Sequence, residues 1–178
     1  LSDSDLRHVS MRGADLSNTR LDRVDMSDMD ATLADLSGSI ASNSIMIHAW
    51  MPGANLSNAV YKDCHINAAN LFAANLSGIV LESSHEEGFS AINLANLEEA
   101  DMTGASMRNI SAEECNMKKT NLTGADLTHA VLSGTIMRNA NVAGTNFQDV
   151  ELASVTMCFA NFSDALNANI PSFKRNLR

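Results

Sequence analysis

The chain has 178 residues, of which 45% are hydrophobic but only 4% are aromatic, and its formal net charge is −9. A chain of this length usually forms one domain, and so few aromatic rings indicate a core of many small, equivalent sites. The negative charge argues against nucleic-acid binding, which needs clustered lysine and arginine side chains. The sequence also contains no signal peptide and no apolar run long enough to span a membrane.

The three cysteines, Cys64, Cys115 and Cys158, are an odd number without metal-ligand spacing. This pattern argues against a disulfide scaffold and predicts residence in a reducing compartment. The chain begins at Leu1 without a methionine and already within the repeat described below. We therefore expect it to be a piece of a longer protein.

Apolar residues recur with a period of five in the first half of the chain. Every fifth residue from Leu1 to Leu81 is apolar, and the residue two positions earlier is mostly small. On a helix, five residues rotate the side chain by roughly 140°, so the apolar positions would spread around the cylinder. On a strand, five is an odd number, so successive apolar residues would point to opposite faces. The pattern is satisfied only if the chain turns a corner every five residues.

A longer period of twenty is superimposed on the first. Near-identical pentapeptides are centred on Leu16, Leu36, Leu56 and Leu76. Four corners close one square coil of twenty residues, and stacked coils would pair their backbones at roughly 4.8 Å. One corner would hold residue types that tolerate positive φ, namely Asn18, Gly38, Asn58 and Gly78.

The register shifts between Leu81 and Ile92, which are eleven residues apart, and the period of five then resumes. The corner pair of a small polar residue and Gly or Asn, such as Ser77-Gly78, continues at Thr103-Gly104 only if Met102 stacks on Leu76. These two central residues are twenty-six apart. This separation predicts a six-residue insertion that forms a loop near residues 83–88.

The repeat ends after Phe162, because Asn167 takes the next central position and Pro171 follows. An open solenoid end exposes unpaired backbone and needs a cap. We therefore divide the chain into a β-helix over residues 1–165 and a cap, or a linker to a following domain, over residues 166–178.

The repeated Ala-(Asp/Asn)-Leu-x-Gly units resemble those of the pentapeptide-repeat family over roughly residues 1–165. The resemblance implies an all-β fold, a right-handed quadrilateral β-helix of about eight coils, with the handedness implied by the family alone. The family includes gyrase-targeting resistance proteins that resemble DNA in shape and charge. It also includes amino-terminal domains of secreted bacterial effectors, notably HECT-like ubiquitin ligases, and the Met- and Ser-rich repeats of this chain look more like that group.

No motif in the sequence predicts catalysis, a cofactor or a metal site. The five histidines are dispersed, whereas a metal needs three or four converging ligands. Cys64 and Cys115 fall at the small inward position, where a buried cysteine acts as a small hydrophobic residue. We expect no enzyme activity in this chain, and the ligase chemistry that the resemblance implies would lie in a separate part of a longer protein.

Two surface features are candidates for partner binding. The first is a group of apolar residues at outward positions of the third and fourth coils: Ile45, Ile47, Trp50 and Phe72. Exposed apolar clusters mark interaction sites, and tryptophan is enriched at binding hot spots. The second is the predicted loop, where Glu86 and Glu87 would meet basic side chains, because insertions on a rigid scaffold often carry binding function.

Acidic residues recur at fixed positions elsewhere. Glu98 is expected to stack on Lys118 and Arg138, and Glu99 on Lys119, as cross-strand pairs. Five aspartates share the position before the central residue, where a short acceptor can bond a neighbouring backbone N–H: Asp5, Asp15, Asp25, Asp30 and Asp35. If these carboxylates instead faced outward in rows, they would resemble a phosphate backbone.

The leading interpretation is a non-catalytic recognition domain of a bacterial effector that is secreted into the reducing cytoplasm of a host cell. It would bind a host protein, by resemblance one of the ubiquitin machinery, and position a separate catalytic domain. The alternative is an acidic, DNA-mimicking inhibitor of a DNA-binding enzyme such as gyrase, acting in the bacterial cytoplasm. A third interpretation is a scaffold without a specific partner.

Overall fold

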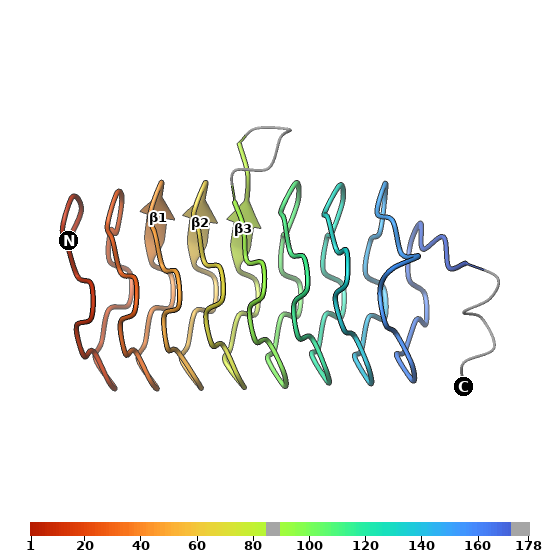
Figure 1. The fold of residues 1–178 in the computed structure, drawn as a ribbon, viewed down its shortest axis with the longest axis horizontal. Coiled ribbons are helices and arrows are strands. Elements are labelled where there is room, and N and C mark those ends of the chain that lie inside the picture. Colours follow the sequence, from red (N-terminus) through yellow and green to blue (C-terminus); the bar gives the residue numbers. More distant parts are fainter. Residues whose placement is uncertain (85–89, 172–178) are drawn as a thin grey trace.

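The computed structural model describes residues 1–84 and 90–171. The chain forms a β-helix whose coils stack along one axis (Figure 1). Backbone pairing joins residues twenty apart in parallel, for example Asp5 with Asp25 and Asp35 with Asn55. The predicted β-helix with a twenty-residue period is confirmed. Its right-handedness and the number of coils stay predictions.

Each pentapeptide contributes one face and one corner. The central residue points inward, the pre-central residue lies on the outer surface of the face, and the next two residues form the corner. The second corner residue has positive φ, as predicted, with values of 54° at Asn18 and 63° at Gly38. We number the faces by their central residues: face 1 contains Leu16, Leu36, Leu56 and Leu76; face 2 contains Leu21, Ala41, Tyr61 and Leu81; face 3 contains Met26, Met46, Ile66 and Ile92; face 4 contains Ala31, Met51, Leu71 and Leu97.

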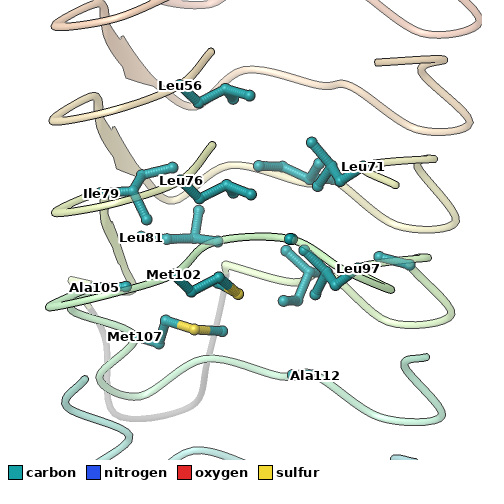
Figure 2. Close-up of a cluster of buried hydrophobic side chains, with 14 of the residues drawn as sticks. Leu56, Leu71, Leu76, Ile79, Leu81, Leu97, Met102, Ala105, Met107 and Ala112 are labelled. Carbon is teal, nitrogen blue, oxygen red and sulfur yellow. The ribbon is translucent and has the colours of Figure 1, made fainter. Parts of the chain in front are cut away.

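The core consists of the central residues and the small residues two positions before them. Leu56, Leu76 and Met102 stack in successive coils (Figure 2), and all three are buried. Tyr61 is among the largest fully buried side chains. Its hydroxyl lies 2.9 Å from Ser39 Oγ, which satisfies the polar atom, and burial raises the pKa of Tyr61. The interior is therefore a set of equivalent layers, as the low aromatic content predicted.

Three short strands form one parallel sheet on face 2, in the order β1–β2–β3. They are β1 (Ile40–Ser42), β2 (Val60–Lys62) and β3 (Val80–Glu82). Their pre-central residues Ile40, Val60 and Val80 are β-branched, whereas most pre-central residues on the other faces are Asp or Asn. Branched side chains favour extended backbone, and these strands extend through the first corner position. Branching alone does not suffice, because Ile45 and Ile136 at the same position form only single bridges.

The register shift has the predicted size. Backbone pairing changes from a spacing of twenty to one of twenty-six, as between Asn75 and Asp101. Since one coil takes twenty residues, six residues are inserted.

The insertion leaves the coil at the corner between faces 2 and 3, directly after β3 (Figure 1). Ser84 is its first residue, and its N and Oγ donate to the carboxylate of Asp63 at 2.9 and 2.6 Å. The regular path resumes at Ser90, whose hydroxyl donates to the carbonyl of Glu82 at 2.5 Å. Both ends of the insertion are thus bonded to the preceding corners.

Backbone pairing continues to Leu166, which pairs with Asn146. The next residue, Asn167, donates from Nδ2 to Asn146 Oδ1 at 2.8 Å. The regular ladder ends at the position where the sequence pattern fails. The division into a β-helix and a cap or linker over 166–178 stays a prediction.

Candidate protein-interaction surface

Asp and Asn side chains at the pre-central position organise the surface of face 1, much of face 4 and the first coils of face 3. Each accepts a hydrogen bond from the backbone N–H two residues later, so the side chain closes the corner. Asp35 accepts from Ser37 at 2.9 Å, and Asn75 accepts from Ser77 at 3.0 Å. The predicted backbone-bonding role is confirmed for all five aspartates: Asp5, Asp15, Asp25, Asp30 and Asp35.

The carboxylates of the first coils also pair with arginines. Arg7 lies 2.6 Å from Asp5 and 3.7 Å from Asp25, and Arg12 lies 3.0 Å from Asp30. The hydrogen bond from the Arg7 side chain is the main cause that lowers the pKa of Asp5 to about 2. Bonds from the Thr32 hydroxyl, the Thr32 backbone and Arg12 lower the pKa of Asp30 to about 2. These carboxylates are engaged within the chain, which leaves them poorly suited to imitate a row of phosphates.

Trp50 interrupts this polar pattern. It takes the pre-central position of face 4, between Asp30 and Asn70 in the backbone pairing, and it is 51% exposed. The residue two positions later is Pro52, which has no backbone N–H. An Asp or Asn at position 50 would therefore find no backbone N–H to accept from at this corner. The corner closes here without a polar pre-central side chain, and the exposed indole projects from the face.

Other apolar side chains line the adjacent corner, between faces 4 and 1. Leu33 is 69% exposed, and Phe72 is 39% exposed. Leu33 lies over Gly53, because a Cβ built at Gly53 would be 2.8 Å from Leu33 Cδ2. Leu33, Trp50, Pro52 and Phe72 thus occupy three successive coils of one face and its corner. We call these four residues the face-4 patch.

The structure separates the other sequence candidates from this patch. Ile45 lies on face 3 between Asp25 and His65, and Ile47 lies at the corner between faces 3 and 4. Both are only partly exposed. Trp50 and Phe72 are therefore the two candidates that share one face and its corner.

The predicted loop starts at the corner between faces 2 and 3, diagonally opposite the corner that holds Phe72. Its attachment points therefore lie away from the face-4 patch. Glu86 and Glu87, the two candidate residues of the loop, lie outside the described residues.

Three exposed apolar residues at the second corner position were missed from the sequence: Leu33, Leu94 and Phe159. Their φ values are 56°, 62° and 60°, and Phe159 is 65% exposed. The repeat already predicted which positions are corners. A leucine or phenylalanine at a corner position that suits Gly, Asn or Asp is the sequence signal that would have identified these residues.

The buried thiols are unreactive by environment. Burial raises the pKa of Cys64 to about 11 and that of Cys115 to about 12, and the thiolate is the reactive form. Within residues 1–84 and 90–171, no group of three or more His, Cys, Asp or Glu side chains is arranged to hold a metal ion. The described part of the chain also has no helix long and apolar enough to cross a membrane.

Comparisons with known proteins agree with this geometry. The family model described as pentapeptide repeats matches eight copies, over residues 1–38, 20–58 and 95–134, which together exceed half of the chain. No curated protein sequence gives a significant match.

Several solved structures are similar over most of the chain. One is HetL, a pentapeptide-repeat protein involved in heterocyst differentiation regulation from the cyanobacterium Nostoc sp. strain PCC 7120, at 23% identity over 93% of this chain and 84% of that one, with a TM-score of 0.46. Another is QnrB1, a plasmid-mediated fluoroquinolone resistance protein, at 17% identity over 93% and 80%, with a TM-score of 0.49. A third is a pentapeptide-repeat protein from the Arabidopsis thaliana thylakoid lumen, at 29% identity over 80% and 70%, with a TM-score of 0.22. Since these TM-scores are below 0.5, the likenesses add no detail to the surface described above.

Proposed function

Because the chain belongs to the pentapeptide-repeat family, we propose that it is a non-catalytic protein-interaction module that presents the face-4 patch to a protein partner. The observation that carries the proposal is the pairing of an exposed Trp50 with Pro52. This pair replaces the polar side chain and backbone donor that close the corners at so many other positions. The fold buries only about half of the indole, which is 51% exposed, so binding accounts for the exposed half better than folding does.

The scaffold under the patch is suited to recognition. Successive coils are joined by backbone hydrogen bonds, such as Trp50 N to the carbonyl of Met29 at 2.8 Å and Met51 N to the carbonyl of Asn70 at 2.8 Å. A rigid support lowers the ordering cost of association. Tryptophan is also one of the residues whose loss most often weakens an interface by more than 2 kcal/mol.

The finer hypothesis belongs to the same proposal. The module would be the amino-terminal domain of a secreted HECT-like ligase effector and would bind a host protein of the ubiquitin machinery. Its support is the resemblance of the Met- and Ser-rich repeats. The length of the native reading frame tests it, because a frame that ends near Arg178 would leave no room for a ligase domain.

The rival reading, a DNA-mimicking inhibitor, is less favoured. It needs outward carboxylates free of internal partners, but Asp5 and Asp30 are paired with Arg7 and Arg12. Binding of purified gyrase to the immobilised chain tests this rival. If Asp15→Asn/Asp35→Asn abolished that binding and Trp50→Asn did not, the DNA-mimicking inhibitor would become the favoured function.

The patch is tested by capturing proteins from host lysate on the wild-type chain and on Trp50→Asn. The asparagine loses no hydrogen bond and faces no donor at Pro52, so the fold should be unchanged by circular dichroism. We expect recovery of a specific partner to fall at least tenfold. Ile40→Asn, an exposed apolar substitution on face 2, is the matched control. Equal recovery by wild type and Trp50→Asn would refute the patch, and Glu86→Ala/Glu87→Ala would then test the loop.

A further inference from the structure

The corner between faces 4 and 1 carries an ordered sequence of side chains along the solenoid axis. From the coil of Pro52 onward, the first corner positions are apolar, then acidic, then basic, then weakly polar: Pro52, Phe72, Glu98, Lys118, Arg138 and Cys158. Over the same coils, the second corner positions run from the small Gly53 to the exposed Phe159. Neighbouring members of each column are one coil apart, roughly 4.8 Å. We call these two columns the corner ridge.

The charges in the centre of the ridge are only partly used within the chain. Lys119 Nζ lies 2.7 Å from Glu99 Oε1, which confirms that predicted pair. Glu98 shares a column with Lys118 and Arg138 as predicted, but the described residues contain no ion pair among the three. Glu98 Oε2 instead accepts a hydrogen bond from Asn116 Nδ2 at 3.1 Å. Glu98, Lys118 and Arg138 therefore retain charge for an external partner.

We propose that the corner ridge binds the corner ridge of a second copy of this chain, with the two solenoids antiparallel. The two-fold axis would lie between the coils of Glu98 and Lys118, in the plane of the interface and perpendicular to the solenoid axis. Such an axis reverses the order of the coils but keeps each column opposite itself. The interface is isologous, so every contact occurs twice.

The register that places Glu98 opposite Lys118 of the second copy also matches the flanking residues. Phe72 then faces Arg138, and a guanidinium over an aromatic ring is an attractive contact. Pro52 and Gly53 face Cys158 and Phe159, so the most exposed ring of the ridge lies against Pro52 and the exposed Leu33 that covers Gly53. The order apolar, acidic, basic and, at Phe159, apolar is complementary to its own reverse. This self-complementarity is why a second copy fits the ridge better than an unrelated partner.

The inference rests on the proposed function in one respect, because both assign face 4 and its corner to protein contact. Pairing would cover Phe72 and Pro52 and would therefore compete with a different partner for the face-4 patch. Trp50 itself lies in the pre-central column, outside the ridge. The two ideas can thus be tested with different residues.

Charge exchange tests the pairing. Sedimentation equilibrium of the purified chain over a range of concentrations should show a monomer–dimer equilibrium. Glu98→Lys and Lys118→Glu should each raise the dissociation constant at least tenfold, because each places two pairs of like charges across the axis. The double variant Glu98→Lys/Lys118→Glu should restore the wild-type constant. Glu113→Lys, the same charge change at an exposed corner of face 3, is the control and should leave the dimer intact.

Thiol cross-linking tests the register independently. With a short bismaleimide reagent that spans the side chains between the two backbones, Pro52→Cys should form a covalently linked dimer through Cys158 of the second copy, and Cys158→Ser in the same chain should abolish it. Gln148→Cys, at a corner of face 2, should not form a dimer with Cys158.

The pairing would be overturned if the chain stayed monomeric at every concentration or if Glu98→Lys left the dissociation constant unchanged. It would equally be overturned if the double variant did not recover the wild-type dissociation constant, or if Pro52→Cys gave no cross-linked dimer. The proposed function fails separately, if Glu98→Lys and Glu98→Lys/Trp50→Asn recover host proteins equally.

Discussion

The first coils and the coils after the insertion use the same surface position in two chemically different ways. Before Asn55, most polar pre-central residues on faces 1, 3 and 4 are aspartates, and arginines pair with several of them. After Ser90 asparagine is the commonest residue at this position on faces 1 and 4, joined in a ladder from coil to coil. Asn116 Nδ2 donates to Asn96 Oδ1 at 3.0 Å, and Asn161 Nδ2 donates to Asn141 Oδ1 at 3.0 Å.

The difference follows from the donors that each side chain offers. Both types accept the backbone N–H of the corner, but only the amide can also donate to the residue in the neighbouring coil. A column of carboxylates repels itself, and Asp15 opposes the lowering of the Asp35 pKa. The amide ladder thus stabilises the stacking of coils without counterions. The carboxylate column needs a neighbouring arginine or asparagine as a donor, and Asn55 Nδ2 donates to Asp35 in this way at 3.0 Å. One backbone therefore carries a region that depends on ionisation and one that mostly does not.

Acidification should separate the two regions most clearly. The pKa values of six aspartates in the first coils are lowered in the folded chain: Asp3, Asp5, Asp15, Asp22, Asp30 and Asp35. A lowered folded pKa contributes stability that is present above the ordinary value near 3.8 and is lost as the pH falls toward 2. We expect pepsin digestion between pH 4 and pH 2 to cleave the first coils before the coils around Met137. Simultaneous cleavage of both regions would contradict this comparison.

Removing one rung of the amide ladder should have the next largest effect. Asn121 donates to Thr103 Oγ1 at 2.8 Å and accepts from Thr123 Oγ1 at 2.6 Å. Asn121→Ala removes these hydrogen bonds and the acceptor for the corner N–H. It should therefore lower the free energy of unfolding by about 2 kcal/mol. Urea denaturation measures the change. Gln148→Ala, at an exposed corner, is the control and should stay near the wild-type value.

Converting one carboxylate into an amide should have the smallest effect at neutral pH. Asp35→Asn keeps the acceptor for Ser37 N and gains a donor toward Asp15, so the urea midpoint at pH 7 should hardly move. The same substitution should shift acid unfolding of the first coils to lower pH, because one ionisation is removed. A large loss of stability at pH 7 would show that the carboxylate charge itself is required.

Much of the fold was predictable because it repeats. A period of five excludes helix and strand, and the twenty-residue recurrence of Leu16, Leu36 and Leu56 predicts the coil. Corner residues such as Gly38 follow from backbone sterics, and the shift between Leu81 and Ile92 gives the size of the insertion. These are local rules applied many times, so a single chain contains enough examples to establish them.

The tertiary structure alone decided which side chains meet. Ile45 and Trp50 are neighbours in the sequence but lie on different faces, whereas Leu33 and Gly53 are twenty residues apart and in contact. The sequence pattern placed Glu98, Lys118 and Arg138 in one column but could not show that Glu98 bonds to Asn116 rather than to Lys118. The physical reason is that contacts between coils depend on rotamers and hydrogen-bond competition between side chains far apart in the chain. The repeat determines positions, and stacking determines partners.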